Sequence, residues 1–219
     1  MKSTFICLAN SKKYGERCIA GILVSKDETG RWKIIRNENQ PKWIRPVSNR
    51  EHGEVKEQEV KNISLLDVVE ADIAYDCPNG YQSENKFFRT GSLRKVSGVS
   101  LKPENLDLLV NRDVKFLFGG TGKAVSTDEI KTINHSLVLI KANNPEIIYK
   151  KDPLKPQYRI KFIFNDQSYE LPITDVNFIE AFLKDQNLLL GKTHFYFTVS
   201  LGVVYEGWHY KLVAGIIAI

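Results

Sequence analysis

Residues 158–173 decide the fold class, and they read Tyr-Arg-Ile-Lys-Phe-Ile-Phe-Asn-Asp-Gln-Ser-Tyr-Glu-Leu-Pro-Ile. Aromatic and branched side chains occupy every second position as far as Phe164, and basic ones fill most of the gaps. A period of two is typical of a β-strand, and the polar residues 165–168 turn the chain into a second strand over 169–173. The pattern predicts a β-hairpin.

Similar strand signals recur along the whole chain. Apolar, β-rich runs bounded by turn residues lie at 4–9, 17–24, 32–36, 43–47, 65–73 and 137–141. Asn10 and Ser11 are expected to close the first of these strands, and residues 49–62 are expected to form an exposed loop or a short helix. Near the C-terminus, residues 194–205 and 208–217 predict two strands joined by a Glu206-Gly207 turn.

Helix signals are few. Pro103 opens one short helix, over 103–110, and Thr174 or Asp175 can cap a second one that runs to Asp185. Residues 76–86 carry the composition of a loop. Many short strands with few helices favour small barrels or sandwiches over a parallel α/β sheet. The chain is long enough for two barrels of about five strands, each with one helix.

Composition places the chain among ordinary globular proteins, with 42% hydrophobic and 26% charged residues. The three cysteines, Cys7, Cys18 and Cys77, form no Cys-x-x-Cys pair, so a reducing compartment is expected. The apolar runs at the two ends are too short for a secretion signal or a membrane span, and we expect a cytoplasmic protein with no membrane partner.

Charge is unevenly distributed along the sequence. Residues 1–50 hold 11 basic and 4 acidic side chains, whereas residues 51–85 hold 2 basic and 9 acidic side chains. Basic segments that meet on one face of the fold would attract a polyanion, and a solvated surface with random clustering is the equal alternative.

Motifs for catalysis are incomplete. Residues 118–124, Phe-Gly-Gly-Thr-Gly-Lys-Ala, contain the glycines and lysine of a phosphate loop, but Leu117 and Ala124 stand where that pattern needs Gly and Ser or Thr. A flexible loop that attracts anions stays open as an interpretation. His52, His135, His194 and His209 show no zinc spacing. The sequence therefore predicts no metal, no cofactor and no catalytic residue, and an enzyme is the least favoured class.

Several motifs together resemble the dual OB-containing domain family of bacterial and archaeal proteins. They are Cys7-Leu8-Ala9-Asn10-Ser11, residues 17–21, Trp43-Ile44-Arg45-Pro46-Val47-Ser48, residues 65–69, Gln82-Ser83-Glu84-Asn85, residues 198–202 and residues 210–214. The resemblance implies a mainly β fold of two small OB-like β-barrels packed together, each with a short helix. We expect a first barrel over 1–100, with an acidic insert at 49–64, and a second over 101–219.

OB folds bind single strands through a basic groove and aromatic platforms. Trp43 and Arg45 share a strand face. A core position is nevertheless the favoured interpretation of Trp43 and Trp208, and Arg45 can pair with Glu51 or Glu54 instead of a ligand. Tyr196 is the favoured exposed platform, on a strand face with His194. The predicted ligand-binding residues are Asn10, Ser11, Arg17, Trp43, Arg45, Ser48, Gln82, Glu84, Asn85, His194, Tyr196 and Lys211.

Alternative roles stay open for the loop residues in this set. Asn10 and Ser11 also suit turn chemistry, and residues 82–85 also suit a solvated loop.

The favoured function is a non-catalytic module that binds or senses nucleic acid, single-stranded or RNA, or a nucleotide. The resemblance adds a role in a prokaryotic conflict (defence) system, with a partner effector protein. The alternative is a protein-interaction adaptor that docks a partner enzyme through the acidic residues 51–85 or the terminal strands.

Overall fold

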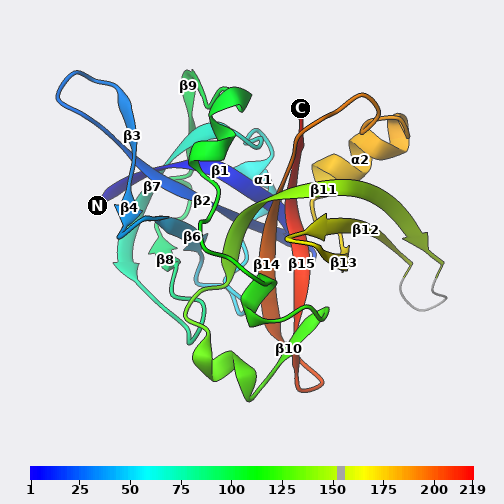
Figure 1. Ribbon diagram of the computed structural model, residues 1–219. Coiled ribbons are helices and arrows are strands. Elements are labelled where there is room, and N and C mark those ends of the chain that lie inside the picture. The colour runs from blue at the N-terminus through cyan, green and yellow to red at the C-terminus, as the bar shows by residue number, and fades with distance from the viewer. Residues whose placement is uncertain (152–155) are drawn as a thin grey trace. The chain divides into compact units, whose positions relative to one another are not determined.

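A computed structural model describes residues 1–151 and 156–219. Contacts divide the chain into two compact units, Met1–Arg112 and Asp113–Ile219 (Figure 1). The sequence-based division after residue 100 differs, because the side chains of Arg36 and Gln40 donate to the carbonyls of Leu108 and Arg112, which ties residues 101–112 to the first unit. Among the described residues, no helix is long and apolar enough to cross a membrane.

The first unit consists almost wholly of strands. Its elements, in chain order, are β1 (Lys2–Lys13), β2 (Glu16–Lys26), β3 (Trp32–Ile34), β4 (Arg36–Asn37), β5 (Gln40–Pro41), β6 (Trp43–Val47), α1 (Glu57–Val60), β7 (Asp67–Asp76), β8 (Asn85–Phe88), β9 (Arg94–Ser100) and a 3₁₀ turn (Pro103–Leu108). The helix predicted over 103–110 is this 3₁₀ turn, and the loop predicted at 76–86 ends inside β8.

Within the described residues, five strands of the first unit close into a ring in the order β1-β2-β6-β8-β7-β1. The β6–β8 pair is parallel and the other neighbours are antiparallel. Helix α1 lies between β6 and β7 in the chain. A five-stranded Greek-key barrel of this kind is the OB fold.

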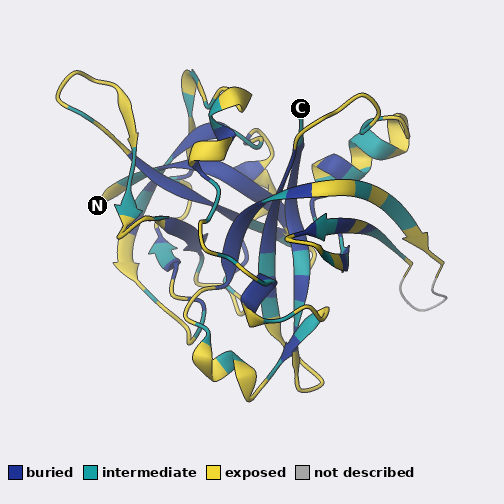
Figure 2. Cartoon of the chain, viewed as in Figure 1, coloured by how far each residue is buried: buried dark blue, intermediate teal, exposed yellow. Residues whose placement is uncertain are grey.

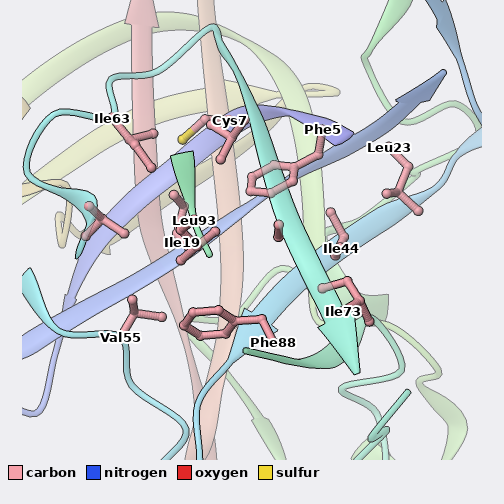
Figure 3. Packing of buried hydrophobic residues seen from close by; sticks show 13 residues of the cluster. Phe5, Cys7, Ile19, Leu23, Ile44, Val55, Ile63, Ile73, Phe88 and Leu93 are labelled. Carbon is pink, nitrogen blue, oxygen red and sulfur yellow. The ribbon is translucent and has the colours of Figure 1, made fainter. Parts of the chain in front are cut away.

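The core of the first barrel follows the two-residue period of its strands. Phe5, Ile19, Ile44 and Phe88 project into the same space, as Figure 3 shows. The acidic insert contributes to this core, because Val55, Val60 and Ile63 belong to the same buried cluster. Of the two expectations for residues 49–62, the short helix is confirmed as α1, whereas full exposure is wrong for Glu54 and for the apolar residues, which are buried.

The second unit carries its own sheet. Its elements are two 3₁₀ turns (Leu117–Gly119 and Glu129–Thr132), β10 (Ala124–Ser126), β11 (Leu137–Lys150), β12 (Gln157–Phe164), β13 (Gln167–Pro172), α2 (Val176–Lys184), β14 (Phe195–Tyr205) and β15 (Trp208–Ala218).

The second sheet curls into a half-barrel with the strand order β10-β15-β14-β11-β12-β13. Its ends approach through a parallel bridge between Ile173 and Val213, and the backbone N–H of Thr174 donates to the Val213 carbonyl at 2.9 Å. Helix α2 follows β13, as α1 follows β6 in the first unit. Both units thus share the OB order, and the predicted mainly β, OB-like fold is confirmed.

The helix predicted to end at Asp185 is confirmed, with Asp175 as its N-cap. The Asp175 carboxylate accepts the N–H of Phe178 at 3.1 Å and, through its other oxygen, the N–H of Ile216 at 3.0 Å. One buried side chain therefore caps α2 and ties it to β15.

Tight turns set the register of the long hairpins. Asn165-Asp166 and Glu206-Gly207 have positive φ at both positions, which matches the right-handed twist of paired strands, and both predicted turns are confirmed. In the first hairpin this turn is Tyr14-Gly15, with φ of 46° and 82°. The prediction that Asn10 and Ser11 end the first strand is wrong, because β1 continues in register to Lys13.

Strands β1 and β2 approach each other closely at Gly21, and a substitution there tests this contact. A Cβ built there would lie 1.9 Å from the Ile6 carbonyl oxygen, a backbone atom that cannot move aside. We expect Gly21→Ala to lower the free energy of unfolding by about 3 kcal/mol or more, measured by urea denaturation. Gly122→Ala is the control, because its Cβ would meet the Ala124 carbonyl oxygen at an ordinary 3.7 Å. Equal stabilities of the two variants would contradict this account.

Candidate nucleic-acid interface

Four of the predicted ligand-binding residues converge in the first barrel, where β6 meets β8. The Arg45 guanidinium forms an ion pair with Glu84 at 3.3 Å and donates to the Asn85 amide oxygen at 3.2 Å. The Asn85 amide donates in turn to Gln82 at 3.2 Å. All four residues are buried, and Arg45 is only 2% exposed. This Arg45 cluster (Arg45, Gln82, Glu84, Asn85) fastens the two closing strands and leaves little room for a base contact.

The surroundings of the Arg45 cluster are partly desolvated. Burial raises the pKa of Tyr81 to about 12, against the smaller opposing effect of the Arg45 charge. Burial also lowers the pKa of Lys13, with the charge of Arg45 adding to that effect and Cys18 and Glu54 opposing it. The predicted pairing of Arg45 with Glu51 or Glu54 is wrong, since its carboxylate partner is Glu84.

Three other predicted residues hold the segment 54–63 against the barrel. The Asn10 amide donates to the carbonyls of Val60 and Ile63, at 3.2 and 2.9 Å. Arg17 pairs with Glu57, and the Ser48 hydroxyl donates to the Glu54 carbonyl. These bonds assign a structural role to polar side chains that the sequence placed in loops.

Ser11 and Trp43 are also buried. Ser11 lies opposite Cys18 in the β1–β2 ladder and is 6% exposed. The Trp43 indole N–H donates to Asn111 at 3.1 Å, which draws residues 101–112 over β6. Of the two interpretations of Trp43, packing rather than base stacking is the one that its 9% exposure supports.

The second unit reverses two expectations about aromatic residues. Tyr196, predicted to be an exposed platform, is 2% exposed, because successive residues on both faces of β14 are buried from Phe195 to Val199. His194 precedes β14, is exposed, and has its ring hydrogen-bonded to the neighbouring Thr193 at 2.8 Å. Trp208, for which a core position was favoured, is instead 46% exposed.

Exposed aromatic rings gather at the tip of the β14–β15 hairpin, which is largely exposed in Figure 2. Tyr205 lies opposite Trp208 in the ladder and is 63% exposed, and its ring centroid is 6.4 Å from that of Tyr210. Strand β11 pairs with β14 only as far as Ser200, so the hairpin tip extends beyond this neighbour. The aromatic hairpin, defined as residues 202–210, therefore presents rings that can stack on bases. The local signal in the sequence was aromatic residues flanking the Glu206-Gly207 turn.

A smaller platform lies on the first unit, in the β2–β3 hairpin. Trp32 is 36% exposed, and the Lys26 ammonium sits 5.0 Å from the centre of its ring. Lys33 and Lys2 are exposed on strands that pair with β2. An exposed ring beside lysines is the chemistry that single-stranded nucleic acids recognise.

Lys211 completes the set of predicted residues and is fully buried. Its ammonium donates to the Gly120 carbonyl at 2.7 Å and lies 5.7 Å from the centre of the Tyr169 ring. Burial lowers the pKa of Lys211 to about 8, and the negative charge of Glu129 limits that shift. Lys211 cannot contact a ligand while the loop at Gly120 stays closed.

No metal site is apparent in residues 1–151 and 156–219, where no three His, Cys, Asp or Glu side chains are placed to hold an ion.

Comparisons with known proteins agree with this architecture. The family model described as "Dual OB-containing domain" matches residues 3–216. No curated protein matches the chain.

Among solved structures, a replication protein A heterotrimer bound to ssDNA matches with 11% identity and a TM-score of 0.37, covering 100% of this chain and 48% of that chain. This chain thus spans about half the length of that protein's chain. A murine DNA-binding protein bound with double-stranded DNA matches at 9% identity and a TM-score of 0.36, covering 100% and 96%. The tetrameric p202 HIN2 matches with 8% sequence identity and a TM-score of 0.32, and the match covers 100% of this chain and 93% of that chain.

The Arg45–Glu84 pair generates a prediction about stability. Removing one partner leaves the other charge buried without a counter-ion. Arg45→Met and Glu84→Met are therefore each expected to lower the free energy of unfolding by about 3 kcal/mol. The double variant should lose no more than either single one, because no charge is then left alone. Urea denaturation of all four proteins measures this coupling, and additive losses would show that the pair does not act as a unit.

The buried Lys211 leads to a prediction about how the stability of the fold depends on pH. Its folded pKa of about 8 lies below the unfolded value of 10.5, so between these values the unfolded chain binds more protons and stability rises with pH. From pH 7.5 to 9.5 the wild type should gain roughly 1 to 2 kcal/mol relative to Lys211→Met. Denaturation at both pH values measures the difference, and a constant difference would rule out titration of Lys211.

Proposed function

The chain belongs to the dual OB-containing domain family, and from this premise we propose that it binds single-stranded nucleic acid through exposed aromatic side chains. The observation that carries the proposal is the aromatic hairpin, where Tyr205, Trp208 and Tyr210 lie beside the loop that joins the last two barrel strands. In OB folds this loop and the face of the second and third strands are where oligonucleotides bind.

Stacking on rings supplies affinity for any base, because every base has a π-face. Phosphate contacts would come from basic side chains, and the first unit has 19 Lys and Arg against 15 Asp and Glu. Trp32 with Lys26 offers a second stacking position on that unit. The expected ligand is therefore a flexible single strand, whose bases can leave their own stack to reach a ring.

An adaptor that docks a partner through its acidic residues is less well supported. Many of the carboxylates in 51–85 are already engaged within the first unit. Glu70 pairs with Arg94 at 2.7 Å, Asp67 with Lys95 at 2.7 Å, and Glu84 with Arg45. A surface whose charges are neutralised by its own chain gives little attraction to a partner. A sensing role in a conflict system and a cytoplasmic location remain predictions from the sequence.

Trp208 is the residue that tests the proposal. We expect Trp208→Ala to weaken binding of a labelled oligothymidine by about tenfold or more, because the loss of one stacked base costs about 1–3 kcal/mol. Fluorescence anisotropy at 50 and 200 mM salt measures the affinity, which should fall as salt rises. Leu190→Ala is the matched control, since Leu190 is 79% exposed and has no ring.

Three outcomes would count against the proposal. Trp208→Ala could bind as tightly as the wild type and the Leu190→Ala control, or the wild type could bind no single strand of DNA or RNA. A tighter complex with double-stranded DNA that Trp208→Ala leaves unchanged would likewise count against stacking on this hairpin.

A further inference from the structure

A glycine-rich loop precedes β10 in the second unit and takes no part in the proposed stacking. The glycine-rich loop is defined as residues 119–123, Gly-Gly-Thr-Gly-Lys, and most of it is exposed. Gly119 has a φ of +79°, and the preceding Phe118 has a φ of +48°, which is uncommon for a residue with a side chain. The loop is therefore held in a sharply bent conformation at its first residue.

Tyr169 of β13 and Lys211 of β15 hold this loop closed. The Tyr169 hydroxyl accepts the N–H of Leu117 at 3.3 Å and donates to the Gly120 carbonyl at 3.4 Å. The Lys211 ammonium donates to the same carbonyl at 2.7 Å, and the backbone N–H of Lys211 donates to the Lys123 carbonyl at 2.9 Å. One carbonyl oxygen of the loop thus receives two buried donors.

This arrangement leaves a buried positive charge poorly compensated. Among the described residues, the hydrogen bond of the Lys211 ammonium goes to the neutral Gly120 carbonyl, and the negative charge that acts on it is that of Glu129. The Glu129 carboxylate itself accepts hydrogen bonds from the N–H and the hydroxyl of Ser126 at 3.0 and 2.8 Å. Burying an ammonium without a carboxylate is costly, and an anion placed beside it would relieve that cost.

We propose that the glycine-rich loop and Lys211 form a binding site for a phosphate group, distinct from the aromatic hairpin. Rotation of the Gly120–Thr121 peptide would carry the Gly120 carbonyl away from Lys211 and turn the Thr121 N–H toward it. The loop then offers backbone N–H donors beside an ammonium, which is the chemistry of a phosphate-binding loop. A Cβ at position 120 would approach Lys211 Nζ to 3.9 Å, and Lys123 is an exposed second cation at the rim.

The site binds phosphate and does not hydrolyse a nucleotide. Ala124 follows Lys123 where a Ser or Thr hydroxyl would hold Mg²⁺, and Leu117 replaces the first glycine of the nucleotide-hydrolysing pattern. The phosphate can belong to a small molecule, such as a nucleotide, or to the backbone of a nucleic acid. Both present the same anionic oxygens, and the experiment separates them.

The test uses the full chain, labelled with ¹⁵N, and follows the backbone amides of Gly119, Gly120 and Gly122. The probes are inorganic phosphate, pyrophosphate, adenosine monophosphate and an oligothymidine without terminal phosphates. We expect saturable shifts of these amides with at least one probe. Shifts with pyrophosphate or the nucleotide indicate a small-molecule site, and shifts with the oligothymidine alone indicate a backbone phosphate. If no probe moves these amides, the site does not exist.

Variants separate this site from the aromatic hairpin. Calorimetric titration with the strongest probe should show at least tenfold weaker binding for Lys211→Met and about threefold weaker binding for Lys123→Ala. Lys192→Ala, which removes an exposed lysine between α2 and β14, should bind as the wild type does. Because Lys123 is exposed, its variant keeps the test valid if Lys211→Met fails to fold. Unchanged binding in Lys123→Ala and in a folded Lys211→Met would overturn the proposal.

Trp208→Ala keeps the glycine-rich loop intact. It should retain binding of a small phosphate probe even where it loses the oligothymidine. Loss of both ligands in this variant would show that the two sites are one, contrary to the proposal.

Discussion

Closure of a β-ring by a short parallel pair is the constraint on which the first unit depends. Strands β6 and β8 are in register only from Arg45–Asn85 to Val47–Phe87, so few backbone hydrogen bonds hold the ring shut. The Arg45–Glu84 ion pair lies at that junction, and the Arg45 N–H donates to the Glu84 carbonyl at 2.9 Å. A buried ion pair adds little net stability, but its geometry tolerates one register only. The register of the β6–β8 pair is therefore specified by the ion pair, because the backbone pairing between these strands is short.

The second unit meets the same requirement with a hydrogen-bonded helix cap. Its ends approach through the Ile173–Val213 bridge, and Asp175 lies two residues beyond it. One carboxylate oxygen caps α2 and the other accepts from Ile216 on β15, so the helix anchors the last strand beside β13. The two barrels share one strand order and stabilise its weakest junction with different side chains. Similar topology therefore does not require similar residues at equivalent positions.

Most of the long strands, the last two hairpins and the second helix could be predicted because their signals are local: alternation, turn residues and a capping aspartate. Strands β8, β9 and β10 were not predicted, and β8 begins inside the segment expected to be a loop. The candidate site could not, because exposure depends on register between distant strands. Tyr196 and Trp208 are both aromatic residues in strands with alternating patterns. Strand β11 pairs with the part of β14 that contains Tyr196, but this pairing ends before the hairpin tip that contains Trp208. Arg45 and Glu84 lie in separate motifs, and only the parallel β6–β8 pairing shows that each neutralises the other. Polar character alone cannot distinguish such a pair from two ligand contacts.

The difference between local signals and long-range register explains why the family resemblance describes the fold better than the ligand. Motif residues such as Asn10, Arg45 and Glu84 tie segments of the first barrel together through side-chain contacts within the chain. The exposed rings of Tyr205 and Trp208 lie between two of these motifs, residues 198–202 and residues 210–214. Residues 203–208 at the hairpin tip are all exposed, so they can change without disturbing barrel closure. Under the proposed function, residues at the hairpin tip set the ligand preference, and the motif residues stabilise the barrel that presents them.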